Sequence, residues 1–183
     1  VDVSEKNSVR VFASVILTIN TVTNEIISYK KPNTTLSNAS LKVYGKDSVG
    51  LYANGGSDIT LNNMSNMEVG EGALLFYGSG FTNSSNVTDY AQLALNGNNT
   101  LTVKKGGVAF YLKGNDLNSI RENSTIGQLD ITLEDGAILS IIEGTGGNGP
   151  FSTTQILTST SGGGSPTGLI ANGIFVNTAS GNY

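Results

Sequence analysis

One pattern occurs four times in this 183-residue chain: a short apolar stretch, a link containing glycine, and a second apolar stretch. The copies are residues 41–43 with 49–53, 67–69 with 74–78, 101–103 with 108–112, and 131–133 with 138–142. Measured from Val43, the spacings to Val69, Val103 and Leu133 are about 26, 34 and 30 residues, in the range of solenoid and repeat proteins. A repeat of this length predicts stacked units, because one unit cannot bury its apolar residues alone.

Each copy predicts two strands joined by a sharp corner. Glycine follows the apolar anchor by three residues in three copies, at Gly72, Gly106 and Gly136, and the first copy has one extra residue in the link. Glycine lets the backbone turn without a Cβ clash. Further strand candidates, at 58–61, 90–95 and 126–129, lie between the copies. We therefore predict an all-β fold, a right-handed parallel β-helix with looser terminal strands, whose unequal loops leave one side.

The aligned second stretches predict columns of side chains along the stack. Alternate residues of a strand point to the same face. We expect two buried columns: Val49, Leu74, Val108 and Ile138, and then Leu51, Phe76, Phe110 and Ser140. The intervening positions are then expected outside: Gly50, Leu75, Ala109 and Leu139, followed by Tyr52, Tyr77, Tyr111 and Ile141.

The column of Tyr52, Tyr77 and Tyr111 is the candidate ligand-binding site. An exposed aromatic strip can dock a protein or a carbohydrate. The simpler interpretation is structural, because aromatic side chains stacked across strands stabilise a sheet.

Composition excludes several function classes. The chain has no Cys and no His, which excludes disulfides and removes the commonest metal ligand and general base, so we expect no cofactor and no metal. Because the net charge is −4, we expect no nucleic-acid partner. The closest acidic groupings are Glu68/Glu71 and Glu134/Asp135, and Glu71, Lys105 and Asp135 share one corner position. These are expected to be solvated corner residues and not the facing carboxylate pair of a glycosidase.

The segment 47–56 (DSVGLYANGG), together with its later copy at 72–77, resembles the degenerate repeats of autotransporter passenger domains. The similarity is strongest to the large fusobacterial outer-membrane adhesins, and it covers mainly residues 41–145. The resemblance implies a right-handed β-helix that is exported through a C-terminal β-barrel outside this chain and displayed on the cell surface. It also implies a non-enzymatic adhesin whose partner is a protein or glycan receptor on a host or bacterial cell.

The flanks predict less regular structure. Residues 9–19 alternate apolar and polar side chains, as one long or two short strands do. We expect an N-terminal strand unit or cap at 1–32, β-helix coils at 33–145, and Gly/Ser-rich loops with terminal strands, including 156–157 and 173–176, at 146–183. Because the chain starts at Val1, it is expected to be an excised or processed segment.

Three functions remain open at this point. The first is an adhesin segment that itself binds a surface partner. The second is a structural stalk that extends a distal binding tip. The third is a polysaccharide-active β-helix, which would release reducing or unsaturated sugars.

Overall fold

The structure is a computed structural model, and it describes residues 2–3, 9–14, 16–19, 21–23, 26–82, 88–114, 125–134, 136–144 and 173–177. These residues form strands and turns, and no helix is present among them. The strands are β1 (Asp2–Val3), β2 (Val9–Ser14), β3 (Ile16–Ile19), β4 (Ile26–Lys30), β5 (Asn33–Ser37), β6 (Ser40–Val43), β7 (Val49–Asn54), β8 (Asp58–Asn62), β9 (Asn66–Val69), β10 (Leu74–Ser79), β11 (Phe81–Thr82), β12 (Thr88–Asp89), β13 (Gln92–Val103), β14 (Val108–Gly114), β15 (Thr125–Leu133), β16 (Ala137–Gly144) and β17 (Gly173–Asn177).

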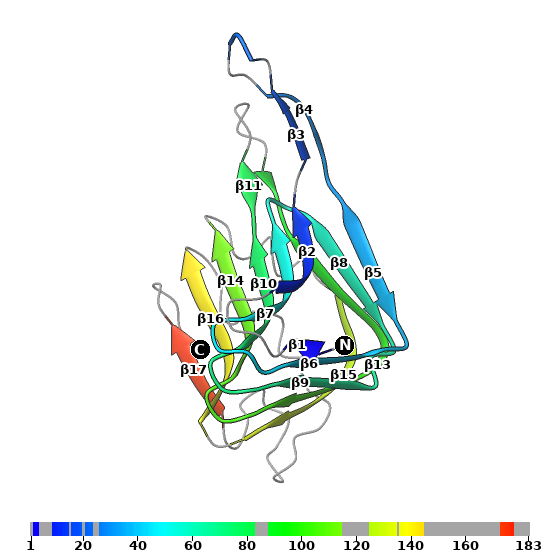
Figure 1. Ribbon diagram of the computed structural model, residues 1–183, viewed down its shortest axis with the longest axis vertical. Helices are drawn as coiled ribbons and strands as arrows, with labels where there is room; N and C mark the ends of the chain where they lie inside the picture. The colour runs from blue at the N-terminus through cyan, green and yellow to red at the C-terminus, as the bar shows by residue number, and fades with distance from the viewer. Residues whose placement is uncertain are drawn as a thin grey trace.

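Two large sheets of parallel strands form the body of the molecule (Figure 1). The six-stranded sheet has the order β17-β16-β14-β10-β7-β2. The seven-stranded sheet has the order β1-β6-β9-β13-β8-β5, with β15 also paired to β13. The long strand β13 joins two halves of this sheet, because its first part pairs with β8 and its last part with β9. The predicted all-β, parallel-strand class is therefore confirmed.

The four copies of the repeat pair with one another in the predicted register. In the first stretches Val43 pairs with Val69, Val69 with Val103, and Val103 with Leu133. In the second stretches the pairs are Val49–Leu74, Leu74–Val108 and Val108–Ile138. The strands predicted between the copies are also present, as β8, the first part of β13, and β15. Register follows the apolar pattern here because a slip of one residue would expose the core face.

The corners between the two stretches stack as the glycine positions indicated. Gly72, Gly106 and Gly136 have φ values of 71°, 73° and 78°, the left-handed conformation that glycine adopts at little cost. In the first copy Asp47 takes this place with φ 60°. The corners bond to one another, since the amide of Asp47 donates to the carbonyl of Gly72 at 2.8 Å and that of Gly72 to Gly106 at 2.9 Å.

Asparagine shapes the corner between the two halves of the seven-stranded sheet. Asn38 and Asn63, both with φ 52°, precede β6 and β9, and Gly97 bends β13 with φ 71°. Asn99, which is buried, accepts a hydrogen bond from the amide of Met64 at 3.0 Å and donates to the carbonyl of Gly97 at 3.1 Å. A buried amide whose donors and acceptor are satisfied in this way costs little to bury.

The apolar core lies between the two sheets, and one predicted column is wrong. Val49, Leu74, Val108 and Ile138 were expected inside but are half-buried on the outer side. Gly50, Leu75, Ala109 and Leu139 were expected outside but are buried. A Cβ at Gly50 would lie 2.7 Å from Cγ2 of Val43, so this position faces the core.

The second predicted column, Leu51, Phe76, Phe110 and Ser140, is buried as expected. Two successive residues of each strand therefore face inward, for example Gly50 and Leu51. The in-and-out alternation of the strand is shifted by one residue at this step. The ladder pairing between β7 and β10 omits the same step, passing from Leu74–Val49 to Phe76–Leu51. A straight strand alternates strictly, whereas a strand that bends around the core turns two neighbours inward.

The N-terminal flank contains two strands, as the alternation of residues 9–19 predicted. β2 pairs in parallel with β7 and extends the six-stranded sheet, while β3 forms an antiparallel hairpin with β4. The hairpin projects from the body at the top of Figure 1. At the other end, the strand expected at 173–176 is β17, paired with β16. The strand expected at 156–157 lies outside the described residues, and the domain boundaries at 32 and 145 stay predictions.

Loops of unequal length leave the molecule at one corner, as predicted from the spacings. This corner, called the loop corner below, follows β2, β7, β10 and β14 of the six-stranded sheet and leads into the seven-stranded sheet. Its connections are 15–32 after β2, 55–57 after β7, 80–91 after β10 and 115–124 after β14. The β3–β4 hairpin and the β11–β12 hairpin are both insertions at this corner. The other two corners keep nearly constant length, so they carry the stacking.

Candidate functional site

The outer surfaces of the two sheets differ in chemistry. Outward positions of the seven-stranded sheet are mainly polar or charged, among them Asn33, Thr35, Ser37, Asp58, Thr60, Asn62, Gln92, Asn96, Lys42, Glu68, Thr102, Lys104, Thr132 and Glu134. Outward positions of the six-stranded sheet form two apolar columns, the first being Val9, Val49, Leu74, Val108 and Ile138 and the second Phe12, Tyr52, Tyr77, Tyr111 and Ile141. An apolar strip on one side of a polar molecule is the usual mark of an interaction surface.

The second column begins with a stack of four aromatic rings, called the aromatic column below. The ring centroids of Phe12 and Tyr52 lie 5.2 Å apart, those of Tyr52 and Tyr77 4.5 Å, and those of Tyr77 and Tyr111 5.6 Å. The first two pairs are nearly parallel, with interplanar angles of 19° and 15°, and the third is tilted by 32°. Parallel pairing places the rings one strand apart, close to the normal strand separation of about 4.8 Å.

The structure therefore brings together all three predicted site residues, Tyr52, Tyr77 and Tyr111. Each is half-buried, because its ring faces are covered by the neighbouring rings. Each tyrosine keeps part of its side chain exposed on the outer face of the six-stranded sheet. Such a surface combines apolar contact with hydrogen bonding, and aromatic residues of this kind are enriched in protein interfaces.

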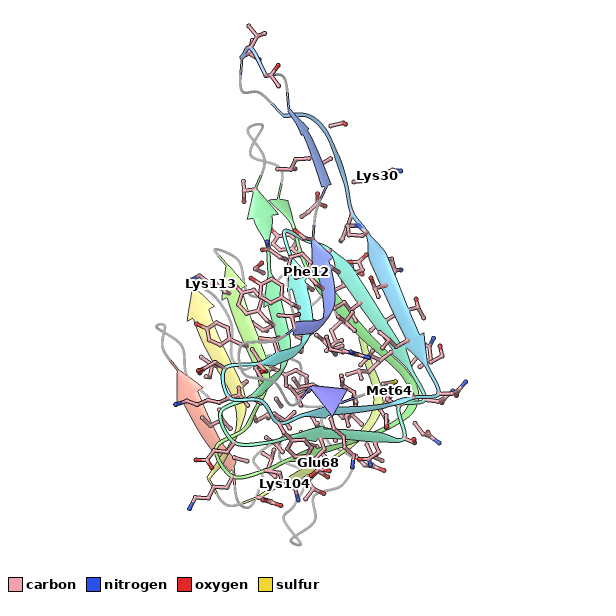
Figure 2. The ribbon with its side chains drawn as sticks, viewed as in Figure 1. Phe12, Lys30, Met64, Glu68, Lys104 and Lys113 are labelled. Atoms are coloured by element: carbon pink, nitrogen blue, oxygen red, sulfur yellow. The ribbon has the colours of Figure 1, made fainter. Side chains whose placement is uncertain are left out.

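Phe12 is the member of the aromatic column that the sequence analysis missed. It lies on β2, and Figure 2 shows it below the β3–β4 hairpin. A signal was present, since Val9-Arg10-Val11-Phe12-Ala13 matches Val49-Gly50-Leu51-Tyr52-Ala53 in its apolar, aromatic and alanine positions. The structure pairs these two segments in that register, Phe12 with Tyr52 and Ala13 with Ala53.

The aromatic column runs beside the loop corner. Tyr52 lies two residues before the end of β7 and Tyr77 two residues before the end of β10, and the connections to the next sheet start there. In repeat proteins, insertions that gather on one face commonly build the binding face. The loop corner and the aromatic column are thus neighbouring parts of one candidate surface.

A group of titratable side chains fastens the two hairpins of the loop corner. Lys31 Nζ, just after β4, lies 3.1 Å from Oδ1 of Asp58 and donates to the carbonyl of Tyr90 at 3.1 Å. Asp89 on β12 accepts a hydrogen bond from the Tyr29 hydroxyl, which raises the pKa of Tyr29. Partial burial raises the pKa of Asp58, opposed by the hydrogen bond and charge of Lys31.

These contacts of Tyr29, Lys31, Asp58 and Asp89, called the latch below, were not predicted, because the four residues are far apart in the sequence and follow no motif. The latch is structural in its chemistry: the Lys31 ammonium binds the carboxylate of Asp58, and the Tyr29 hydroxyl binds that of Asp89. The contacts are partly exposed, so each contributes little stability by itself. Together they join the β3–β4 hairpin to the β11–β12 hairpin and to β8.

Two of the carboxylates weighed as catalytic candidates belong to the side of the seven-stranded sheet, away from the aromatic column: Glu68 lies on β9, and Glu134 directly follows β15. Lys104 Nζ lies 2.7 Å from Oε1 of Glu134 and 3.7 Å from Oε1 of Glu68, and Figure 2 labels Glu68 and Lys104 side by side. The hydrogen bond from Lys104 lowers the pKa of Glu134. A general acid needs a raised pKa, so this arrangement is that of an ion pair.

The corner residues follow the expected pattern where they are described. Glu71 and Lys105 are exposed, and Asp135 lies outside the described residues. A Cβ at Gly106 would lie 2.9 Å from Cγ of Glu71, and one at Gly136 3.3 Å from Cγ of Lys105. Each charged side chain therefore covers the glycine corner of the next copy.

Among the residues that the structure describes, no group of three or more carboxylate, thiol or imidazole side chains could hold a metal ion. In the same part of the chain, no helix has the length and hydropathy needed to cross a membrane. No protein-family model, curated protein or solved structure matches the chain.

Proposed function

We propose that this chain is a non-enzymatic segment of a surface-displayed adhesin, built as a right-handed parallel β-helix of the autotransporter passenger type. Support for the architecture comes from the parallel pairing of each repeat copy with the next and from the stacked corners at Gly72, Gly106 and Gly136. The resemblance of residues 47–56 to passenger repeats supports the display on an outer membrane.

The observation that carries the proposed binding is the aromatic column on the apolar outer face. Its partner is a protein or glycan receptor on a host or bacterial cell. Tyrosine edges and hydroxyls suit either, because they offer apolar area and hydrogen bonds at a low cost in side-chain entropy. The adjoining loops would supply the remaining contacts of the interface.

A stalk without binding activity is the second candidate, and the same rings favour it. Each tyrosine stacks on its neighbours at 4.5 to 5.6 Å, so the column also holds successive copies together. In a pure stalk this stabilisation would be its whole purpose. The two candidates differ in whether the exposed parts of these tyrosine side chains contact a partner.

The test measures binding of the purified, fluorescently labelled chain to cells by flow cytometry. One variant changes Tyr52, Tyr77 and Tyr111 to Ser, and a second changes the same three residues to Phe. The Phe variant retains the ring stack and loses only the hydroxyls. We expect binding to fall at least tenfold in the Ser variant, and in the Phe variant in proportion to the hydrogen bonds that the hydroxyls make, about 0.5–1.5 kcal/mol each.

A matched control triple lies in one column of the seven-stranded sheet: Lys42, Glu68 and Thr102, each changed to Ser. It alters the same three repeat copies on the polar side, and its binding should remain unchanged. Circular dichroism and thermal unfolding show which variants are folded. A folded wild-type chain without measurable binding would favour the stalk, and equal losses in both triples would refute the aromatic column as the site.

A further inference from the structure

The corner between the two halves of the seven-stranded sheet carries the same short polar motif in successive copies. This corner lies where β5 leads into β6, where β8 leads into β9, and within β13, at the right of Figure 1. The motif is Asn-x-Ser/Thr, the acceptor sequence of asparagine glycosylation. Its occurrences here, called the asparagine corner below, are Asn38-Ala39-Ser40, Asn63-Met64-Ser65 and Asn98-Asn99-Thr100.

Each triplet of the asparagine corner alternates between solvent and core. The asparagine at its start is exposed in every copy. The middle residue faces the interior, and Figure 2 labels one of these residues, Met64, which is fully buried. The third residue returns to the outer side, since Ser65 and Thr100 are exposed and Ser40 is half-buried. The amide and the hydroxyl of one triplet therefore lie on the same side of the chain, where an enzyme that recognises both can reach them.

Turn geometry accounts for only part of this pattern. Asn38 and Asn63 have positive φ, which asparagine tolerates better than most residues. In the third copy Gly97 has the positive φ, so the turn does not require Asn98, yet the triplet is present. The side chain of Asn63 uses its Oδ1 atom to accept a hydrogen bond from the amide of Asn98 at 3.2 Å. Sugar transfer takes place at Nδ2, so a modified Asn63 retains this contact.

The other triplets of the chain do not form such a set. Asn33 lies at the start of strand β5, and its Oδ1 accepts a hydrogen bond from the Thr60 hydroxyl at 3.5 Å. Glycosylation acceptors lie typically in surface loops and not within a strand. The triplets that begin at Asn83, Asn86 and Asn123 lie outside the described residues.

We propose that the asparagine corner is a glycosylation site, at which a separate enzyme transfers a sugar from a glycosyl phosphate ester to Nδ2 of the exposed asparagines. A C–N bond forms between the anomeric carbon and Nδ2, and the bond from that carbon to the phosphate oxygen breaks. The phosphate leaves with the electron pair, and the amide gives up one proton. An attached sugar is bulky and solubilising, and here it covers the polar sheet and leaves the aromatic column on the other sheet accessible.

The experiment is glycopeptide mass spectrometry on the chain isolated from the cells that produce it. At least one asparagine of the corner should carry added sugar mass. Asn66 and Asn96 are internal controls, because both are exposed near this corner but start no triplet, and both should be unmodified. A single hexose indicates a nucleotide-linked donor, whereas a preassembled oligosaccharide indicates a lipid-linked donor.

Hydroxyl variants made in the same cells test whether the motif itself is recognised. Each occupied asparagine should lose its sugar completely when the third residue of its triplet loses the hydroxyl, in Ser40→Ala, Ser65→Ala or Thr100→Val. The sugar should be retained in the matched variants Ser40→Thr, Ser65→Thr and Thr100→Ser. The last control matters because the Thr100 hydroxyl also donates a hydrogen bond to the carbonyl of Ser65 at 2.5 Å. Circular dichroism shows which variants are folded.

Several results would overturn the proposal. Sugar on none of the asparagines of the corner in the wild-type chain would show that the corner is not an acceptor. Sugar that persists after removal of the hydroxyl, or that also appears on Asn66 and Asn96, would indicate unspecific attachment. Binding through the aromatic column is measured separately on unmodified chain, so the failure of one proposal is distinguishable from the failure of the other.

Discussion

Removing the ring of Tyr77 tests whether the aromatic column stabilises the stack of repeat copies. Tyr77 lies between two rings, at 4.5 Å from Tyr52 and 5.6 Å from Tyr111, whereas Phe12 at the front stacks on Tyr52 alone within the column. Tyr77→Ala thus breaks two ring contacts and Phe12→Ala breaks one. Tyr77→Phe preserves both contacts and removes only the hydroxyl.

The expected magnitudes follow from these contacts. An aromatic pair contributes about 0.5–1.5 kcal/mol beyond the area that it buries. Two pairs therefore contribute about 1–3 kcal/mol, to which the half-buried side chain adds a part of the roughly 1.5–3 kcal/mol of full burial. We expect Tyr77→Ala to lower the free energy of unfolding by about 2–4 kcal/mol. Phe12→Ala should cost about 0.5–1.5 kcal/mol, because its side chain is already 62% exposed.

Equilibrium unfolding in urea, followed by circular dichroism, measures the difference. The midpoint should shift while the dependence on urea concentration stays the same, which indicates a change in stability alone. Tyr77→Phe should lose less stability than Tyr77→Ala, because it keeps both ring contacts. A loss for Tyr77→Ala no larger than that for Phe12→Ala would refute the reasoning, since the number of stacked neighbours would then not matter.

Two further outcomes are expected. Gly56→Ala should lower the melting temperature more than Gly72→Ala, although both positions have positive φ. The new Cβ would lie 2.6 Å from Cβ of Asp89 at position 56, but 3.2 Å from the flexible stem of Lys46 at position 72. Equal losses in the two variants would contradict the clash. Glu134 has a lowered pKa through Lys104, so its stabilising effect is present above the ordinary glutamate pKa of about 4.3 and is lost as pH falls through the lower folded value. The difference in urea midpoint between wild type and Glu134→Gln should therefore shrink from about pH 6 to about pH 3, and a difference that grows would contradict the ion pair.

The aromatic column could be predicted only in part. Tyr52, Tyr77 and Tyr111 share a column because the repeat spacing sets which strands pair, and the spacing can be counted in the sequence. Phe12 has the same neighbours in space, but it precedes the first complete copy. Between it and that copy lies the β3–β4 hairpin, whose length hides the periodicity.

The latch at the loop corner could not be predicted at all. Tyr29 and Lys31 precede their partners Asp89 and Asp58 by long and irregular intervals. Contacts between two insertions depend on how each hairpin leaves the body, and no local periodicity encodes that direction. Only the folded arrangement shows that these four side chains meet.

Which strands are neighbours follows from the order of the amino acids, because the spacing of Val43, Val69, Val103 and Leu133 can be counted and the glycines mark the corners. Which side chains face inward depends on how the two sheets pack against each other. Gly50 faces Leu41 and Val43, and the equivalent residues Leu75, Ala109 and Leu139 are buried, because the strand bends around the core after the corner. The direction of that bend depends on packing between two sheets, which alternation along one strand cannot specify.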